Sequence, residues 1–425
     1  MSRLRDKVNK LPCIFFYLGL TIELLVVVID KSAIPPLPEG HIYRVTFVLF
    51  ALTVFFTRYT KKEWALLIFF VLFTLGMYLF TGQNVALRAV IFIAAMRSMK
   101  NKPFLLPDVS TAGGRHMGVA VSFMPMLKYI FWLIFSGTLL IIILSFFGIG
   151  RGIMSTDVFR DGVMETRYSF GMGHPNSFHF MVLFLIALFL YIYIERLHLL
   201  IFVLLFFGHF GLFLLTDSKA GFAAGTIVIS GAIIHKLSDR IKNASWVYWI
   251  GMLVFLVCIG ISVWAAVVSV EAWDNPLIAQ FDRLFTGRIK GLYFGNHIHA
   301  GAFETWSLFA DKGNFVYEYQ FDMGWVRLFY WFGVIPGLVF CVLHLLLLNE
   351  CRKQKDYMGL VLIVACSVYT IVEPQMMSLM LARNYLLFLF GMYWGRMLYL
   401  EGKEEIYLWQ MCRRAADCHC ERSSM

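Results

Sequence analysis

Residues 177–215 read SFHFMVLFLIALFLYIYIERLHLLIFVLLFFGHFGLFLL. Two apolar runs, 177–194 and 197–215, lie on either side of a short polar break that contains Arg196. Each run is close to the roughly 20 residues that an α-helix needs to cross the hydrocarbon core of a bilayer. The stretch therefore predicts two membrane-spanning helices joined by a short turn.

Apolar residues dominate the whole chain. Hydrophobic residues make up 60% of the 425 residues and charged residues only 15%, whereas a soluble globular chain has about 45–50% apolar and about 25% charged residues. We therefore expect an all-α polytopic integral membrane protein in which residues 1–425 form a single membrane domain. About twelve apolar runs approach the spanning length. They lie near 12–29, 42–57, 64–80, 83–96, 126–148, 177–194, 197–215, 220–235, 246–270, 325–348, 357–372 and 383–399.

The first apolar run and the cysteines indicate no processing and no disulfide framework. The run at 12–29 lacks a small-residue cleavage site, so we expect a retained anchor rather than a removed signal peptide. The eight cysteines are scattered along the chain. Cys412, Cys418 and Cys420 with His419 lie in the tail, but their spacing does not pair two CxxC units, which makes a metal site there the weaker alternative.

Basic residues in the short loops predict the orientation. The N-terminal arm carries Arg3, Arg5, Lys7 and Lys10, and every second loop after it is also basic. The positive-inside rule therefore predicts a protein of the cytoplasmic membrane with both termini, including the tail at 400–425, in the cytoplasm. The net charge of +10 is spread over these separate loops, so it gives no reason to expect a nucleic-acid partner.

The same threading places two long segments, 149–176 and 271–324, and the tight turn at 216–219 outside. These parts hold cations that the positive-inside rule does not require: Arg151, Arg160, Arg167, Lys219, Arg283, Arg288 and Lys290, with Arg88, Arg327 and Arg383 near the same boundary. Arginine and lysine bind phosphates through charge-assisted hydrogen bonds, so the set predicts an anionic group at the outer face. For any single residue, snorkelling to lipid headgroups is the alternative.

Four short motifs lie on this predicted outer side. In chain order they are RYSFGMGHPN at 167–176, TDSKAG at 216–221, RLFTGR at 283–288 and FDMGWVRLFYWFGV at 321–334. The first enters a helix, where Pro175 suits a first-turn position and Asn176 is expected to cap. In the second, Gly221 permits a close approach of two helices.

Together, the motifs resemble the Wzy-type polysaccharide polymerases and O-antigen ligases, particularly the capsule and exopolysaccharide polymerases of Gram-positive bacteria. The similarity runs from Arg88 to about Gly337, and RYSFG followed by HPN is its most specific part. Lys219 stands where the family usually has arginine, and Met323 where it usually has asparagine. The remaining motif residues are Gly173, Pro175, Asn176, Ser218, Gly221 and Gly287.

The resemblance implies a GT-C-like membrane glycosyltransferase. Such an enzyme would take undecaprenyl-diphosphate-linked oligosaccharide at the outer face of the cytoplasmic membrane and transfer it to another lipid-linked repeat unit. The family is regarded as inverting and metal-independent, which implies no cofactor. Flippase and chain-length regulator proteins of the same pathway would be its possible partners.

The resemblance and the charges also assign roles to residues. Preorganised cations can stabilise the negative charge on a leaving diphosphate. The expected diphosphate-binding residues are Lys219, Arg288, Arg167, Arg88 and Arg283, with Arg288 also counted as catalytic. The attacking hydroxyl needs a proton acceptor: Asp322, where the ligases carry histidine, is the first candidate and His174 the second. Capping of the tenth span by Asp322 and a backbone hydrogen bond from His174 are the alternatives.

Two other functions remain open for the chain. A ligase would transfer finished glycan to a different acceptor from the same donor site. A flippase for lipid-linked oligosaccharide would show inverted repeats and interrupted helices at the midplane, whereas the polar residues here cluster at one face.

His297 and His299 lack a nearby third ligand for a metal. Glu23 and His209 lie within spans, where ionisable residues are candidates for function, and we expect them to be helix-packing groups.

Overall fold

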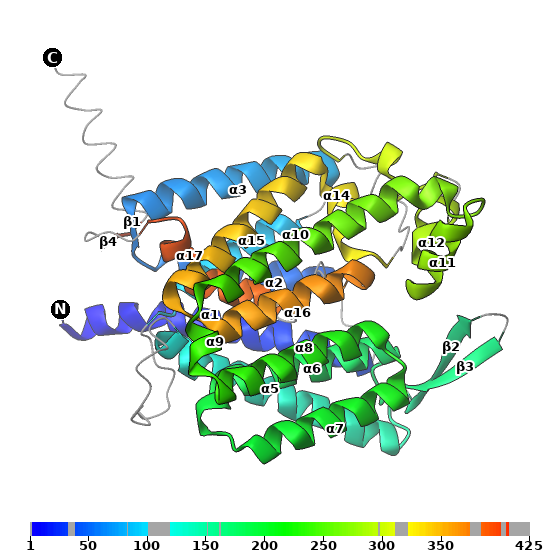
Figure 1. Ribbon diagram of the computed structural model, residues 1–425. Coiled ribbons are helices and arrows are strands. Elements are labelled where there is room, and N and C mark those ends of the chain that lie inside the picture. Colours follow the sequence, from blue (N-terminus) through cyan, green and yellow to red (C-terminus); the bar gives the residue numbers. More distant parts are fainter. Residues whose placement is uncertain are drawn as a thin grey trace.

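The computed structural model describes residues 2–32, 39–82, 84–100, 120–150, 152–160, 163–295, 298–310, 322–374, 384–400 and 405–407. Long helices lie alongside one another in a bundle over this part of the chain (Figure 1). Seven of the described helices are long and apolar enough to cross a membrane. The chain is therefore an all-α membrane-embedded protein, as the composition predicts.

In chain order, the helices and strands have the following bounds in the structure. The helices are α1 (Ser2–Ser32), α2 (Glu39–Phe55), α3 (Lys61–Thr81), α4 (Val85–Arg97), α5 (Ala120–Phe146), α6 (Pro175–Tyr193), α7 (Leu199–Thr216), α8 (Lys219–Leu237), α9 (Asp239–Asn243), α10 (Ser245–Val268), α11 (Pro276–Leu284), α12 (Arg288–Phe294), α14 (Gly324–Phe332), α15 (Val334–Gln354), α16 (Tyr357–Val372) and α17 (Tyr385–Met397). The strands are β1 (Tyr59–Thr60), β2 (Met154–Arg160), β3 (Val163–Tyr168) and β4 (Glu405–Ile406). Short 3₁₀ turns lie at Ile194–Arg196, Ser269–Glu271 and Phe303–Thr305.

The apolar run at 325–348 is not one helix, because the chain breaks at Gly333 into α14 and α15. Gly333 has φ 96°, and a Cβ there would lie 2.6 Å from the carbonyl oxygen of Leu308. The segment beside it supplies the backbone partners that the break needs: the Val334 N–H donates to Ser307 at 2.9 Å, and the Ala310 N–H donates to Phe332 at 3.3 Å. Hydrogen bonds from neighbouring protein make such a break tolerable in a membrane protein.

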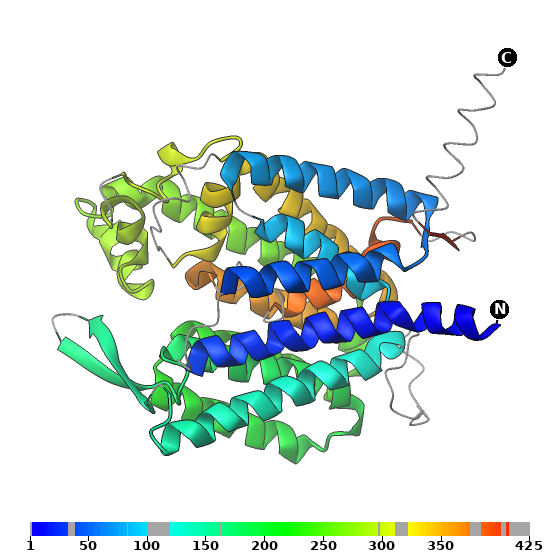
Figure 2. The ribbon, with the colours of Figure 1, turned by 180° about the vertical axis from the view of Figure 1, so that it is seen from behind.

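The two long segments predicted to lie on one side do gather at one end of the bundle. The β2–β3 hairpin, from 149–176, and α11 with α12, from 271–324, lie at the end opposite the start of α1 and the β1–β4 pair (Figure 1). The hairpin is a local departure from the all-helical expectation. Its antiparallel register has an irregularity between Ser155 and Val158. The opposite view shows α1 between α2 and α5 along the length of the bundle (Figure 2).

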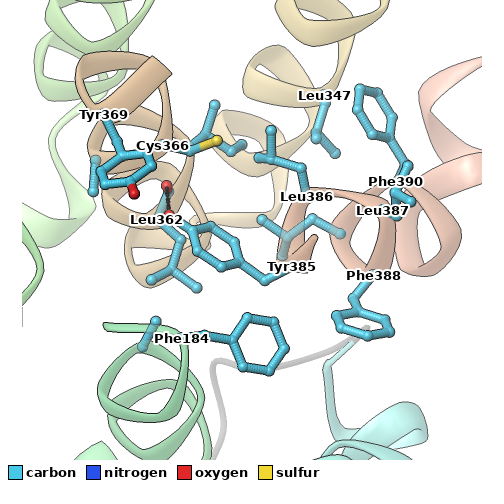
Figure 3. Packing of buried hydrophobic residues seen from close by; sticks show 14 of the residues in the cluster. Phe184, Leu347, Leu362, Cys366, Tyr369, Tyr385, Leu386, Leu387, Phe388 and Phe390 are labelled. Atoms are coloured by element: carbon cyan, nitrogen blue, oxygen red, sulfur yellow. Dashed lines mark hydrogen bonds between the residues drawn. The ribbon is translucent and has the colours of Figure 1, made fainter. Parts of the chain in front are cut away.

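The helix α16 lies in the middle of the packing and is buried nearly all round, as expected for a helix that is apolar on every face. Around it, Tyr385 of α17 donates a hydrogen bond to the Leu362 carbonyl oxygen at 3.1 Å, and Phe184 of α6 lies against Tyr385 with ring centroids 6.1 Å apart (Figure 3). Phe180 packs on Tyr369 in the same way, with centroids 5.3 Å apart. This packing determines where the end of α16 lies.

Candidate active site

A polar cavity of about 210 Å³ lies where α8 and α12 begin and α16 ends. Its polar lining comes from four parts of the chain: Asn176, Asp217, Ser218, Lys219, Thr286, Arg288 and Glu373. A second cavity, of about 160 Å³ between α3, α4, α14, α15 and α17, is lined almost entirely by apolar side chains. Of these two cavities in the described part of the chain, the first brings together groups that carry charge, so it is the candidate active site.

The start of α8 presents a cation to this cavity. Asp217 adopts the left-handed conformation, with φ 45°, and Ser218 is the residue that precedes the first turn. Lys219, the first residue of α8, is exposed, lines the cavity and forms no ion pair with another described residue. A helix N-terminus adds partial positive charge beside it. This corner of the cavity therefore favours an anion.

Arg167 binds Asp217 in the turn before α8 and is not part of the cavity lining. Its Nη2 lies 2.7 Å from Asp217 Oδ2, and only 5% of its side chain is exposed. The expected diphosphate-binding role of Arg167 therefore has no support in its position. The guanidinium stabilises the Asp217 turn, which in turn positions Lys219.

Two histidines, His179 and His209, pack against glycines of α8. Gly221 faces His179 of α6, and a Cβ on Gly221 would lie 2.4 Å from the imidazole Cδ2. Gly225 faces His209 of α7, where a Cβ would lie 2.2 Å from the ring. The two rings meet edge to face with centroids 5.0 Å apart. His179 also shares a 2.8 Å hydrogen bond with Thr216. The glycines thus allow α8 to approach α6 and α7 closely.

Arg288 reaches the cavity from the turn before α12. Gly287 precedes it with φ 80°, and Asp282 Oδ1 accepts the Ile289 N–H at 2.8 Å, which holds the start of the helix. The guanidinium Nη2 lies 2.8 Å from Glu373 Oε1 and 3.3 Å from Asp322 Oδ2. A further hydrogen bond joins Nη1 to the Thr286 hydroxyl. Arg288 is therefore fixed between two carboxylates.

Glu373 is the functional candidate that sequence reasoning missed. It lies one residue beyond α16, and only 6% of its side chain is exposed. Its Oε1 accepts hydrogen bonds from Arg288 Nη2 and Asn176 Nδ2, both at 2.8 Å. Burial raises the pKa of the Glu373 carboxyl to about 7, against the opposing charge of Arg288. The available signal was an acidic residue at the very end of an apolar run.

The histidine of the first motif caps a helix. His174 precedes α6, and its Nδ1 accepts the N–H of Asn176 at 3.2 Å. Pro175 takes the first helical position. The expectation that Asn176 would cap is wrong: Asn176 lies within the first turn and its side chain binds Glu373 instead. Gly173, with φ 74°, precedes the cap in a conformation that suits glycine.

Two other predicted cations also lie away from the cavity lining. Arg88 Nη2 is 2.6 Å from Glu23 Oε1, both side chains are buried, and the guanidinium stacks over Tyr43 at 4.2 Å. Glu23 also accepts the Thr46 hydroxyl at 2.6 Å. Arg88 therefore belongs to a buried ion pair between α1, α2 and α4, because a carboxylate within a span needs a cation. Arg283 is exposed at the end of α11.

The described residues contain no group of three or more His, Cys, Asp or Glu placed to hold a metal ion. His299 stacks on Tyr293 with centroids 3.8 Å apart, and its Nδ1 bonds to the Tyr293 carbonyl oxygen at 2.7 Å. His297, Arg151, Arg383 and the cysteines of the tail lie outside the described residues.

No protein-family model, curated protein or solved structure matches this chain. Of the five predicted diphosphate-binding cations, Lys219 and Arg288 line the polar cavity. Asp322 contacts Arg288 but is about half exposed, at 52%, and stands outside the lining.

Proposed function

We propose that the chain is a membrane glycosyltransferase that polymerises undecaprenyl-diphosphate-linked oligosaccharide repeat units into capsular or exopolysaccharide at the outer face of the cytoplasmic membrane. In this proposal the fold is GT-C-like with about twelve spans, both termini are cytoplasmic, and transfer is inverting and metal-independent. The observation that carries it is that Lys219 and Arg288, from two motifs distant in sequence, line one cavity with a buried carboxylate.

The chemistry of this lining suits a diphosphate leaving group. Breaking a glycosyl–diphosphate bond develops negative charge on the phosphate oxygens, and fixed cations stabilise that charge. Arg288 offers a planar fork that matches phosphate oxygens, and Lys219 offers a compact point charge. Ser218, buried at the start of α8, adds a hydroxyl to the same lining. The acceptor hydroxyl would approach from the side of the cavity that holds Glu373.

Two alternatives share parts of this proposal. A ligase would use the same donor site and a different acceptor, which the cavity does not discriminate. A flippase would need polar groups along a path through the bundle. In the part of the chain that the structure describes, the polar cavity lies at one end, and the break at Gly333 is joined to the segment at 307–310 of that same end. These positions favour transfer over transport.

The test uses purified protein in liposomes, supplied with undecaprenyl-diphosphate-linked repeat units. We expect a ladder of lengthening glycans, with equal rates in the presence and absence of a chelator. Growth that needs a divalent metal would contradict the metal-independent step. Transfer to an added lipid or wall-polymer acceptor without a ladder would favour the ligase. Lipid-linked oligosaccharide that crosses the bilayer without any transfer would favour the flippase.

A further inference from the structure

The buried carboxylate of Glu373 has one oxygen engaged and one available. Arg288 and Asn176 both donate to Oε1. No described residue donates a hydrogen bond to Oε2, and the side chain lines the polar cavity. A carboxylate held in this way has a fixed orientation and an oxygen ready to accept a proton.

We propose that Glu373 accepts the proton of the attacking hydroxyl, a role that rests on the function proposed above. The hydroxyl oxygen of the acceptor sugar attacks the anomeric carbon of the donor. The bond from that carbon to the diphosphate oxygen breaks, and its electron pair leaves with the lipid diphosphate. The hydroxyl proton passes to Glu373 Oε2 and is later released to water.

The two sequence-based candidates are placed less well for this step. Asp322 lies on the exposed side of Arg288 and does not line the cavity. His174 is exposed, and its Nδ1 already accepts the Asn176 N–H at the start of α6. Glu373 shares the lining with Lys219 and Arg288, whereas Asp217, the other carboxylate of the lining, is paired with Arg167 at 2.7 Å. Geometry is the first requirement for a general base.

Arg288 links proton transfer to departure of the diphosphate. In the resting cavity its Nη2 is 2.8 Å from Glu373 and 3.3 Å from Asp322. Protonation of Glu373 neutralises the closer partner, which weakens that ion pair just as the leaving diphosphate gains negative charge. The guanidinium charge then acts on the phosphate oxygens, together with Lys219.

The charges around Glu373 determine its basicity. Burial raises its pKa to about 7, Arg288 and Arg327 lower it, and Asp322 raises it. Lys219 faces it across the cavity. A general base works best with a pKa near the working pH. Because only the ionised form accepts a proton, the rate should rise with pH and reach half its maximum near the pKa of this group.

The experiment measures chain extension against pH for the wild-type protein and three variants. Glu373→Gln keeps the size and an amide oxygen for Arg288 and Asn176, but cannot take up the proton. We expect kcat to fall about 10²- to 10⁴-fold, with a small change in KM and no remaining pH midpoint. Glu350→Gln, which alters a buried, ion-paired glutamate near the end of α15, is the matched control and should keep the wild-type profile.

Asp322→Asn provides a test that does not depend on the folding of the Glu373 variant. Removing this negative charge should lower the Glu373 pKa, so the pH at which the rate reaches half its maximum should move down. Loss of activity in Asp322→Asn with a normal Glu373→Gln profile would assign the proton to Asp322 instead. A wild-type ladder with a fully active Glu373→Gln variant overturns this inference alone, whereas a wild-type protein that builds no ladder overturns the proposed function as well.

Discussion

At the residue scale, the cavity depends on how each cation is paired. Arg288 contacts Glu373 on its buried side and Asp322 on its exposed side, so its orientation is fixed before any ligand arrives. Lys219 has no such partner among the described residues and is exposed. An unpaired cation at a cavity can be substituted without leaving a buried charge behind, so Lys219 offers the cleaner test of anion binding.

Lys219→Ala should reduce chain extension by about 10²- to 10³-fold, the usual effect of removing one preorganised charge-stabilising group. The amount of folded protein in the membrane should not change. Lys219→Arg should retain activity, because it keeps the cation. Lys61→Ala is the matched control: Lys61 is also an exposed first residue of a helix, at the opposite end of the bundle. A Lys219→Ala protein that still makes long polymer would contradict the diphosphate site.

Arg88 differs from Lys219, because its charge is already paired with the buried carboxylate of Glu23. Removing one partner of a buried ion pair costs about 3–5 kcal/mol. We therefore expect Arg88→Gln to lower the yield and thermal stability of the folded protein in detergent. The double variant Glu23→Gln with Arg88→Gln should recover much of that loss. A well-folded Arg88→Gln protein with only a raised KM for the lipid-linked donor would instead indicate that Arg88 binds the donor.

At the element scale, helix packing decides where the cavity cation stands. The glycines of α8 allow it to lie directly against His179 and His209, and the cavity begins at the first turn of the same helix. The buried helix α16 positions Glu373 on the other side. The distance across the cavity is therefore determined by contacts between helices, several residues away from the polar groups themselves.

Gly221→Ala should displace the start of α8, because the added Cβ would lie 2.4 Å from the His179 ring. Overpacking of this kind typically costs about 1–3 kcal/mol. We expect a lower midpoint of thermal unfolding and slower chain extension, since Lys219 moves with the helix. Gly211→Ala in α7 is the control, because nothing lies within 4 Å of its added Cβ. Equal stability of the two variants would show that α8 adjusts without strain.

At the scale of the whole molecule, the polar site lies at the end opposite the start of α1 and the β1–β4 pair (Figure 1). The hairpin and the α11–α12 segment gather at the cavity end, and the start of α1 lies at the other (Figure 1). This arrangement agrees with the threading derived from the loops. The side of the membrane that each end faces is a prediction from the basic loops.

Labelling tests that orientation. Gln280→Cys, exposed on α11, should react with a membrane-impermeant maleimide added to intact spheroplasts. Arg240→Cys, exposed on α9 at the opposite end, should react only after permeabilisation. The wild-type protein measures the background from native cysteines, of which Cys258, Cys341, Cys351 and Cys366 are buried. The reverse pattern of labelling would place the cavity on the cytoplasmic side.

The amino-acid sequence was enough to predict the class of the protein and the approximate position of its helices. Each apolar run satisfies its backbone hydrogen bonds within the segment, so a local pattern is enough to predict it. The motifs also led to Lys219 and Arg288. The β2–β3 hairpin was not predicted. The break at Gly333 was not predicted either, because it depends on backbone partners from residues 307–310.

The pairing of the charges depends on the packing of helices that are distant in sequence. Asn176 and Glu373 are 197 residues apart, and Arg288 and Glu373 are 85 residues apart. No local pattern encodes such contacts, because they depend on how α6, α12 and α16 meet. For the same reason, the sequence did not show that Arg88 and Arg167 form structural ion pairs or that Glu373 lines the cavity. Charge at one end of the bundle was readable in the sequence, whereas the choice of the charges that face the cavity required the packed helices.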